Sequence, residues 1–140
     1  MFKTRVLVLA GGSSSEAEVS HRSGAAVAAA LTEAGYEVTS ADPSRLGFDI
    51  ESALKHCDVV FPALHGKGGE DGSVQAYLEA RGIPFVGAGS ITSATCYDKS
   101  HYKEKLRAAD LLVPEGALVN ELEFWDSPFK IGRASCRERV

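Results

Sequence analysis

The sequence VVFPALHGKGGEDGSVQ, residues 59–75, decides the fold of this 140-residue chain. Its first six residues form an apolar run, which is typical of a strand buried on both faces of a sheet. The run leads into a segment with four glycines among its first eight residues, His65 to Gly72. Glycine lets the backbone reach left-handed conformations and approach a ligand closely. Because a histidine, a lysine and two carboxylates lie among these glycines, we expect function in this loop.

Strands and helices alternate through the rest of the chain. We expect strands at residues 5–10, 36–41, 58–64 and 84–87, and helices at 16–34, 49–56, 73–81 and 90–109, the last broken near Tyr97 and Asp98. An extended segment is expected at 111–119. Strands joined by helices through short loops predict βαβ units. The predicted fold class is therefore α/β, a Rossmann-like parallel sheet with helices on both faces.

Composition and charge restrict the class of protein. A hydrophobic content of 44% is ordinary for a soluble domain with one core. No apolar run approaches the roughly 20 residues that cross a bilayer, and the first ten residues fit a strand better than a signal peptide. The net charge of −4 argues against nucleic-acid binding. We therefore expect a cytoplasmic protein, with Cys57, Cys96 and Cys136 as small buried thiols rather than a disulfide framework or metal ligands.

Two loops are expected to meet at one edge of the sheet. In parallel sheets ligands bind at the carboxyl ends of the strands, where residues 11–16 and 65–72 would lie together. The turn at residues 11–16 fits neither the G-x-G-x-x-G fingerprint nor the P-loop pattern, so a nucleotide fingerprint is poorly supported. Its acidic residues Glu16 and Glu18 could favour the helix N-terminus through the helix dipole. Alternatively, Glu16 could hold the ammonium group of a substrate.

The remaining polar residues leave several roles open. His65 has either a structural or a functional role. Its position at the ligand edge gives the functional role the same weight as the structural one. Glu70 and Asp71 are adjacent, so their side chains point apart, and Asp71 is expected to cap the next helix or brace the loop. Lys99 either belongs to a solvated basic face or contacts a phosphate. We predict no ligand for His21, His56 and His101, which are expected to be structural or at the surface. We expect Phe124 and Trp125 in a core or an interface.

Two motifs resemble a known family. Residues 65–75 resemble an N-terminal motif of the D-alanine–D-alanine ligases, the ATP-grasp enzymes of peptidoglycan synthesis, and GGSSSEAEVS, residues 11–20, is similar to the family's other N-terminal motif. The sequences GAG at 87–89 and DK at 98–99 follow in the family's order. The resemblance covers about residues 5–129 and implies the pre-ATP-grasp N-terminal domain of such an enzyme.

This resemblance implies a reaction and a set of site residues. In the family, ATP phosphorylates the carboxylate of one D-alanine, and the amine of a second D-alanine attacks the acyl phosphate. By resemblance, Glu16 and His65 are catalytic, and Glu16, Ser20, His65 and Gly66 bind the substrate, with Glu16 on the ammonium of the first D-alanine. Lys99 would contact ATP. The cofactors implied are ATP and Mg²⁺, the small-molecule partner is D-alanine, no metal ligand is assigned, and the parent is expected to be a homodimer.

The resemblance ends before the ATP-grasp module of the family. We expect residues 1–120 to form the N-terminal domain and residues 121–129 to begin the central domain. Residues 130–140, with four basic residues and one acidic residue, look like a non-native tail of translated adapter sequence. We therefore expect the fragment to be inactive alone. A non-catalytic α/β binding module and a D-alanine–D-hydroxy acid ligase fragment remain as alternatives, and an unrelated nucleotide-binding module is disfavoured.

Overall fold

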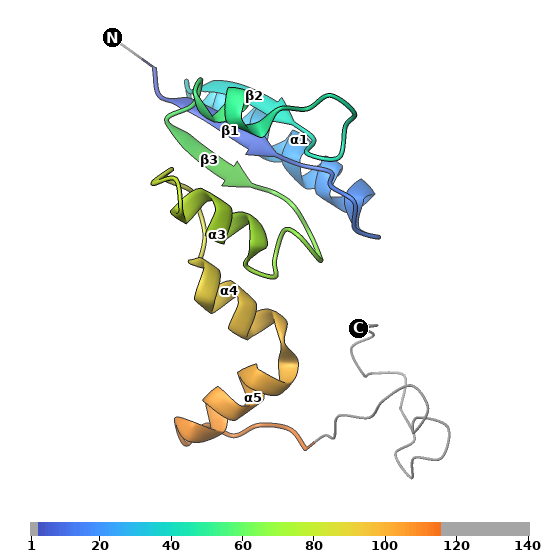
Figure 1. Ribbon diagram of the computed structural model, residues 1–140, viewed down its shortest axis with the longest axis vertical. Coiled ribbons are helices and arrows are strands. Elements are labelled where there is room, and N and C mark those ends of the chain that lie inside the picture. Colours follow the sequence, from blue (N-terminus) through green and yellow to red (C-terminus); the bar gives the residue numbers. More distant parts are fainter. Residues whose placement is uncertain (1–2, 116–140) are drawn as a thin grey trace.

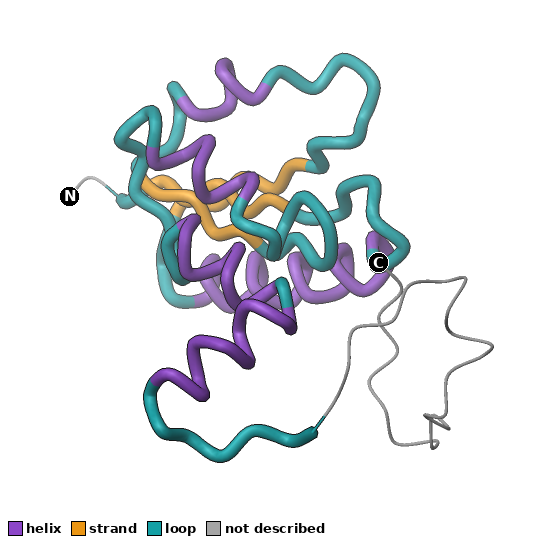
Figure 2. Tube along the Cα trace, turned by 60° about the horizontal axis from the view of Figure 1, so that its bottom comes forward, coloured by secondary structure: helices purple, strands orange, loops and turns teal. Residues whose placement is uncertain are grey.

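The computed structural model of the chain describes residues 3–115 and confirms the α/β class (Figure 1). The strands β1 (Arg5–Leu9), β2 (Glu37–Ala41) and β3 (Val59–Pro62) form a parallel sheet in the order β2-β1-β3. The helices are α1 (Ala17–Glu33), α2 (Ile50–Leu54), α3 (Ser73–Glu79), α4 (Ser90–Tyr97) and α5 (Lys99–Ala108). Helices lie on both sides of the sheet (Figure 2). We call the sheet with α1, α2 and α3 the sheet body, and α4 with α5 the arm.

The central strand β1 supplies the core on both faces of the sheet. Successive side chains of a strand point to opposite faces, so an apolar strand between two helical layers buries all of them. Leu7 and Leu9 pack with Leu54 of α2 and with Val74 and Leu78 of α3. On the other face, Val6, Val8 and Ala10 pack with Ala63 and against Val27, Ala28 and Leu31. Burying each of these leucines and valines stabilises the fold by about 1.5–3 kcal/mol.

A glycine lets α1 approach the sheet closely. A Cβ atom on Gly24 would lie only 2.3 Å from the Cβ atom of Ala10. Gly24 is buried, and its neighbour toward the N-terminus on the same helix face, Ser20, is fully buried as well. The small side chains on this face therefore set the distance between α1 and the end of β1, where the candidate site begins.

The structure corrects the expected fourth strand. Residues 84–87 form only an isolated bridge between Val60 and Phe85, with hydrogen bonds from Val60 N–H to Pro84 O and from Val86 N–H to Val60 O. Proline has no N–H to donate, and Gly87 has φ of +128°, so the extended run stops after one bridge. The segment still covers the outer edge of β3.

The predicted break in the last helix is confirmed at Asp98. Its backbone is extended, and its carboxylate accepts hydrogen bonds from the N–H groups of Ser100 and His101, so it ends α4 and caps α5. The expectation of buried thiols is wrong for Cys96, which is exposed, whereas Cys57 is half-buried. Residues 111–115 have no regular structure.

Several sequence expectations lie outside the described residues. These are the end of the segment at 111–119, Phe124, Trp125, Cys136, the domain start at 121–129 and the tail at 130–140. Among residues 3–115, none of the helices combines the length and apolar character that a bilayer crossing requires.

Candidate functional site

The two loops predicted to meet at the carboxyl edge of the sheet are joined by hydrogen bonds. The Ser14 hydroxyl donates to the carbonyl oxygen of His65 at 2.7 Å. The Ser20 hydroxyl donates to the carbonyl oxygen of Ala63 at 2.7 Å and accepts from the N–H of Gly11 at 2.8 Å. These contacts fix the loop after β1 against the loop after β3. The edge at which parallel sheets bind ligands therefore carries both motifs.

The Gly11-Gly12 turn is held by side chains from two other elements. Gly11 N–H donates to Ser20, and Gly12 N–H donates to the Asp42 Oδ1 atom at 3.0 Å. Both glycines have positive φ, and a Cβ atom on Gly11 would lie within 2.6 Å of Asp42 and His21. The N–H groups of these two glycines therefore already have protein partners and are not available to a phosphate.

Asp42, which we did not select from the sequence, anchors this turn. It follows β2 and also accepts hydrogen bonds from the N–H and hydroxyl of Ser44, while His21 Nε2 lies 3.2 Å from its Oδ2. Burial raises the pKa of Asp42, but the hydrogen bonds from Gly12 and Ser44 and the nearby His21 outweigh it and hold the pKa at about 2. Its position at the end of a parallel strand was the available signal.

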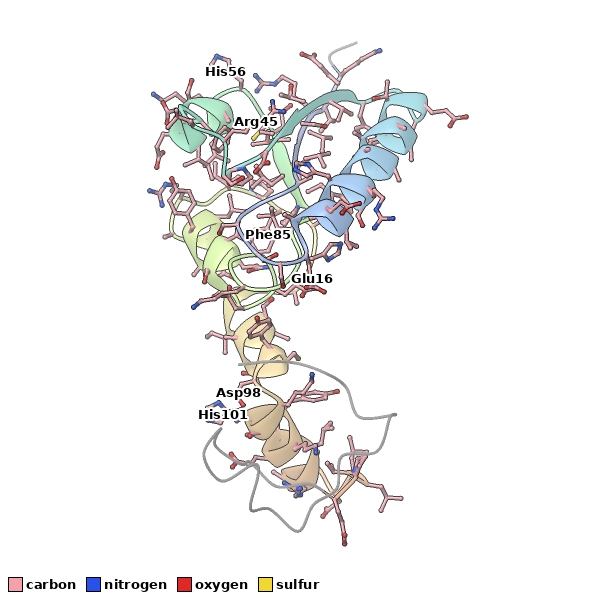
Figure 3. The ribbon with its side chains drawn as sticks, turned by 90° about the vertical axis from the view of Figure 1, so that its right-hand side faces the viewer. Glu16, Arg45, His56, Phe85, Asp98 and His101 are labelled. Carbon is pink, nitrogen blue, oxygen red and sulfur yellow. The ribbon has the colours of Figure 1, made fainter. Side chains whose placement is uncertain are left out.

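Glu16 and Gly66 approach each other across the two loops. Glu16 immediately precedes α1, and a Cβ atom on Gly66 would lie 3.0 Å from its Oε2 and 3.3 Å from the Ser14 hydroxyl. Gly66 has φ of +69°, a conformation that glycine adopts without strain. In Figure 3, Glu16 lies at the edge of the sheet body from which the arm extends. The exposed Glu16 carboxylate is therefore available at the ligand edge.

Ser20, which the resemblance implies to be a substrate contact, lies beneath the turn after β1. It has no exposed surface, and its hydroxyl already donates to Ala63 and accepts from Gly11. In this structure Ser20 fixes the two loops relative to each other.

His65 has polar partners on both ring nitrogens. Its Nε2 lies 3.1 Å from the Ser23 hydroxyl, and its Nδ1 lies 3.6 Å from the Glu70 Oε1 atom. Glu70 also accepts a hydrogen bond from the N–H of Gly66 at 2.9 Å. The structure therefore brings Glu70 to His65, a contact that the sequence analysis did not consider. The side chain of His65 remains about one-third exposed, at 32%.

Asp71 braces the loop, which is one of the two roles predicted for it, whereas the N-cap position of α3 is Gly72. Its carboxylate accepts hydrogen bonds from the N–H of Gly68 at 2.9 Å and from the N–H of Ser73 at 3.0 Å. Burial raises the pKa of Asp71, and these hydrogen bonds lower it further than burial raises it. The carboxylate is therefore used for structure and is not free for acid–base chemistry.

His65 borders two pockets. The smaller, of about 180 Å³, lies between the two loops and is lined by Ser13, Ser14 and Lys67 among others. The larger, of about 500 Å³, extends from His65 to Lys99, the first residue of α5. The structure thus brings His65 and Lys99 to one pocket, whereas Glu16 lines neither pocket and reaches the edge from the start of α1.

The other histidines have local partners, as expected. His21 lies beside Asp42, the Nδ1 atom of His56 lies 2.9 Å from the carbonyl oxygen of Ser52, and that of His101 lies 3.4 Å from Asp98. In the described part of the chain, no group of three or more His, Cys, Asp or Glu residues could hold a metal ion. A Mg²⁺ ion therefore has no evident ligand set within residues 3–115.

Comparisons of sequence place these loops in a family. Residues 39–88 match the sequence pattern described as D-ala D-ala ligase N-terminus. The chain is 44% identical over 115 residues to the D-alanine–D-alanine ligase of Halorhodospira halophila, covering 82% of this chain and 37% of the relative. It is 48% identical over 120 residues to that of Xanthobacter autotrophicus, covering 84% and 38%. The chain thus spans less than two-fifths of the length of these two relatives.

Comparisons of structure agree. The D-alanine–D-alanine ligase of Bacillus anthracis, solved in complex with ATP, superimposes with a TM-score of 0.75 at 36% identity, over 82% of this chain and 38% of that one. The ligase of Aeromonas hydrophila superimposes with a TM-score of 0.74 at 29% identity, over 86% and 52%. The chain therefore corresponds, in sequence and in structure, to the N-terminal part of D-alanine–D-alanine ligases.

Proposed function

We propose that this chain forms the amino-acid-binding wall of a cytoplasmic, ATP-dependent D-alanine–D-alanine ligase that makes a peptidoglycan precursor. The observation that carries the proposal is the contact between the two edge loops, with Glu16 beside Gly66 and Ser14 bonded to His65. Two loops with the family's motifs meet where parallel sheets bind ligands.

Glu16 supports this proposal through its charge and position. An exposed carboxylate makes a strong charge-assisted hydrogen bond to a substrate ammonium group. With the ammonium of the first D-alanine on Glu16, the same amino acid can extend along Gly66 toward His65, which we place near its reacting carboxylate. Holding that carboxylate in one orientation accelerates its reaction by positioning. In this proposal His65 and Glu16 orient the substrate, and Ser20 keeps the loops in register.

The described residues do not themselves make a complete nucleotide site. The N–H groups of Gly11 and Gly12 have protein partners, and residues 3–115 lack a metal-ligand cluster. When bound, ATP with Mg²⁺ would activate the substrate carboxylate. We propose that Lys99, which lines the larger pocket with His65, is the contact of this domain with ATP. The other nucleotide contacts would come from the part of the longer relatives that this chain does not span.

The proposal includes an organisation for the whole chain. Residues 1–120 would form the N-terminal domain and residues 121–129 the start of the central domain, with residues 130–140 a non-native tail. The parent enzyme would be a homodimer that binds D-alanine and ATP, without a nucleic-acid or membrane partner.

A chimaera tests the role of Glu16. Residues 3–115 would replace the matching part of the Xanthobacter autotrophicus ligase, and D-alanine-dependent release of ADP would be measured. We expect the chimaera to be active and the Glu16→Gln change to raise the KM for the first D-alanine by about 10–100-fold, because a hydrogen bond to a charged group contributes about 1.5–3 kcal/mol.

Glu18→Gln is the matched control, because Glu18 lies exposed in the first turn of the same helix. We expect it to leave the KM close to that of the parent chimaera. An active chimaera in which Glu16→Gln and Glu18→Gln behave alike would reject the ammonium contact. The 140-residue chain on its own serves as the baseline for ADP release.

A further inference from the structure

Ser23 contacts one ring nitrogen of His65 from the side of α1. Its hydroxyl lies 3.1 Å from Nε2, which is hydrogen-bond distance. Ser23 directly precedes Gly24, whose missing Cβ atom lets α1 approach the sheet, so the close packing of the helix also brings this hydroxyl to His65. Ser23 is half-buried and lines neither of the two pockets beside His65. The Nε2 end of the ring therefore lies on the side of the helix.

Glu70 lies at the other ring nitrogen. Its Oε1 atom is 3.6 Å from Nδ1, and its Oε2 atom accepts a hydrogen bond from Gly66 N–H at 2.9 Å, which holds the carboxylate beside the ring. Glu70 lines the larger pocket together with His65. The separation of 3.6 Å is longer than an ordinary N–H···O hydrogen bond, so a proton on Nδ1 remains able to bond to another acceptor.

The two contacts together select one neutral form of the imidazole. A neutral ring has one N–H and one acceptor nitrogen, and the hydrogen bond made by one nitrogen decides the state of the other. With the proton on Nδ1, beside the carboxylate of Glu70, Nε2 is the acceptor and the Ser23 hydroxyl donates to it. The opposite form would place the lone pair of Nδ1 beside a carboxylate that can only accept, which is unfavourable.

We propose that Ser23 is a positioning residue for the ligase reaction, because it keeps neutral His65 in the Nδ1–H form and so makes the ring a hydrogen-bond donor to the reacting carboxylate of the first D-alanine. This inference rests on the proposed function, which places that carboxylate near His65. Lys99 lines the same pocket as His65, so both residues can stabilise the negative charge of the reacting group.

The state of the ring can be measured without substrate. The ¹⁵N chemical shifts of the imidazole, observed by long-range ¹H–¹⁵N correlation on the ¹⁵N-labelled full chain, distinguish the two neutral forms. At about pH 8.5, where histidine side chains are ordinarily neutral, we expect His65 in the Nδ1–H form. In Ser23→Ala we expect the shifts to move toward the Nε2–H form, and Ser23→Thr, which keeps a hydroxyl, should restore the parent pattern. An Nε2–H form in the parent chain, or a Ser23→Ala pattern identical to the parent, would overturn the proposal.

The chimaera with the Xanthobacter autotrophicus ligase tests the effect on the reaction. We expect Ser23→Ala to lower kcat about 2–10-fold, the range that corresponds to one lost hydrogen bond, and to leave the KM for the first D-alanine nearly unchanged. Thr32→Ala is the matched control, because Thr32 is an exposed residue of the same helix whose hydroxyl bonds to the carbonyl oxygen of Ala28. We expect it to leave kcat unchanged.

The same chimaera separates this inference from the function on which it rests. An unchanged kcat in Ser23→Ala, in a chimaera whose KM still responds to Glu16→Gln, would reject the role of Ser23 and leave the proposed function intact. An inactive parent chimaera would reject the proposed function and, with it, the donor role of His65. The NMR measurement on the parent chain needs no variant and decides the form of the ring in either case.

Discussion

The sheet body and the arm bury very different amounts of apolar surface. In the sheet body, Leu7, Val8, Leu9, Val60 and Leu78 are each at most 1% exposed. Neither α4 nor α5 contains a buried residue, and Ile91 of α4 is 83% exposed. Figure 1 shows the arm leaving the body below α3. The sheet body is therefore stabilised by its own core, whereas the arm depends on the contacts at its base.

The base of the arm is a compact joint. The carboxylate of Glu79, at the end of α3, accepts hydrogen bonds from the N–H and the hydroxyl of Ser90. These bonds lower the pKa of Glu79. At the other end of α3, Gly72 lies against the backbone of α4, where an added Cβ atom would be 2.5 Å from the carbonyl oxygen of Ser90. The joint matters for function because it sets the distance between His65 on the body and Lys99 on the arm.

The largest expected effect separates the core of the body from the arm. Leu9→Ala is expected to lower the free energy of unfolding by about 2–5 kcal/mol, because it leaves a cavity in a fully buried site. Ile91→Ala, a change on the exposed face of α4, is expected to stay within about 0.5 kcal/mol. Urea unfolding followed by circular dichroism measures both. Similar losses in the two variants would show that the arm shares the core of the body.

The next largest effect is expected from a substitution at the joint between α3 and α4. Gly72→Ala places a Cβ atom against α4 at a residue with φ of +88° and is expected to cost about 1–3 kcal/mol. The amides of α4 should exchange with solvent deuterium faster than in the parent chain, while those of β1 keep their protection. Gly35→Ala is the control, because Gly35 has φ of +93° but nothing within 4 Å of an added Cβ atom. Faster exchange of α4 in Gly35→Ala as well would mean that contact with Ser90 is not the cause.

The smallest effect concerns the anchor of the ligand edge within the body. The folded pKa of Asp42 is about 2, below the ordinary value of 3.8. A carboxyl with a depressed folded pKa stabilises the fold above the unfolded pKa and loses this contribution as the pH falls toward 2. Asp42→Asn should therefore lower the free energy of unfolding at pH 6 by at most about 2 kcal/mol, which is measured as a lower melting temperature. The difference in melting temperature between the variant and the parent chain should shrink between pH 4 and about 2. A difference that is constant with pH would exclude this origin.

The sequence predicted the architecture better than the contacts within the site. Apolar runs indicated the strands and capping residues indicated the helices, and their alternation predicted a parallel sheet. Because ligands bind at the carboxyl ends of parallel strands, the loops after β1 and β3 were expected to meet there. Ser20 could not be judged, because its burial depends on how α1 is rotated against the sheet. Asp42 was missed because its contact with Gly12 depends on the register of β2 against β1. The segment around Phe85 was read as a strand, since apolar residues there do pack on β3, although Pro84 and Gly87 limit the pairing to one bridge.

The central claim is that the edge between the loops after β1 and β3 binds D-alanine. Titration of D-alanine into the ¹⁵N-labelled chain, followed by NMR, tests it most directly. We expect saturable shifts of the backbone amides of Ser14, Glu16, His65 and Gly66, and their loss in the Glu16→Gln variant. Shifts confined to the arm, or unchanged signals from these four residues at saturating D-alanine, would contradict it.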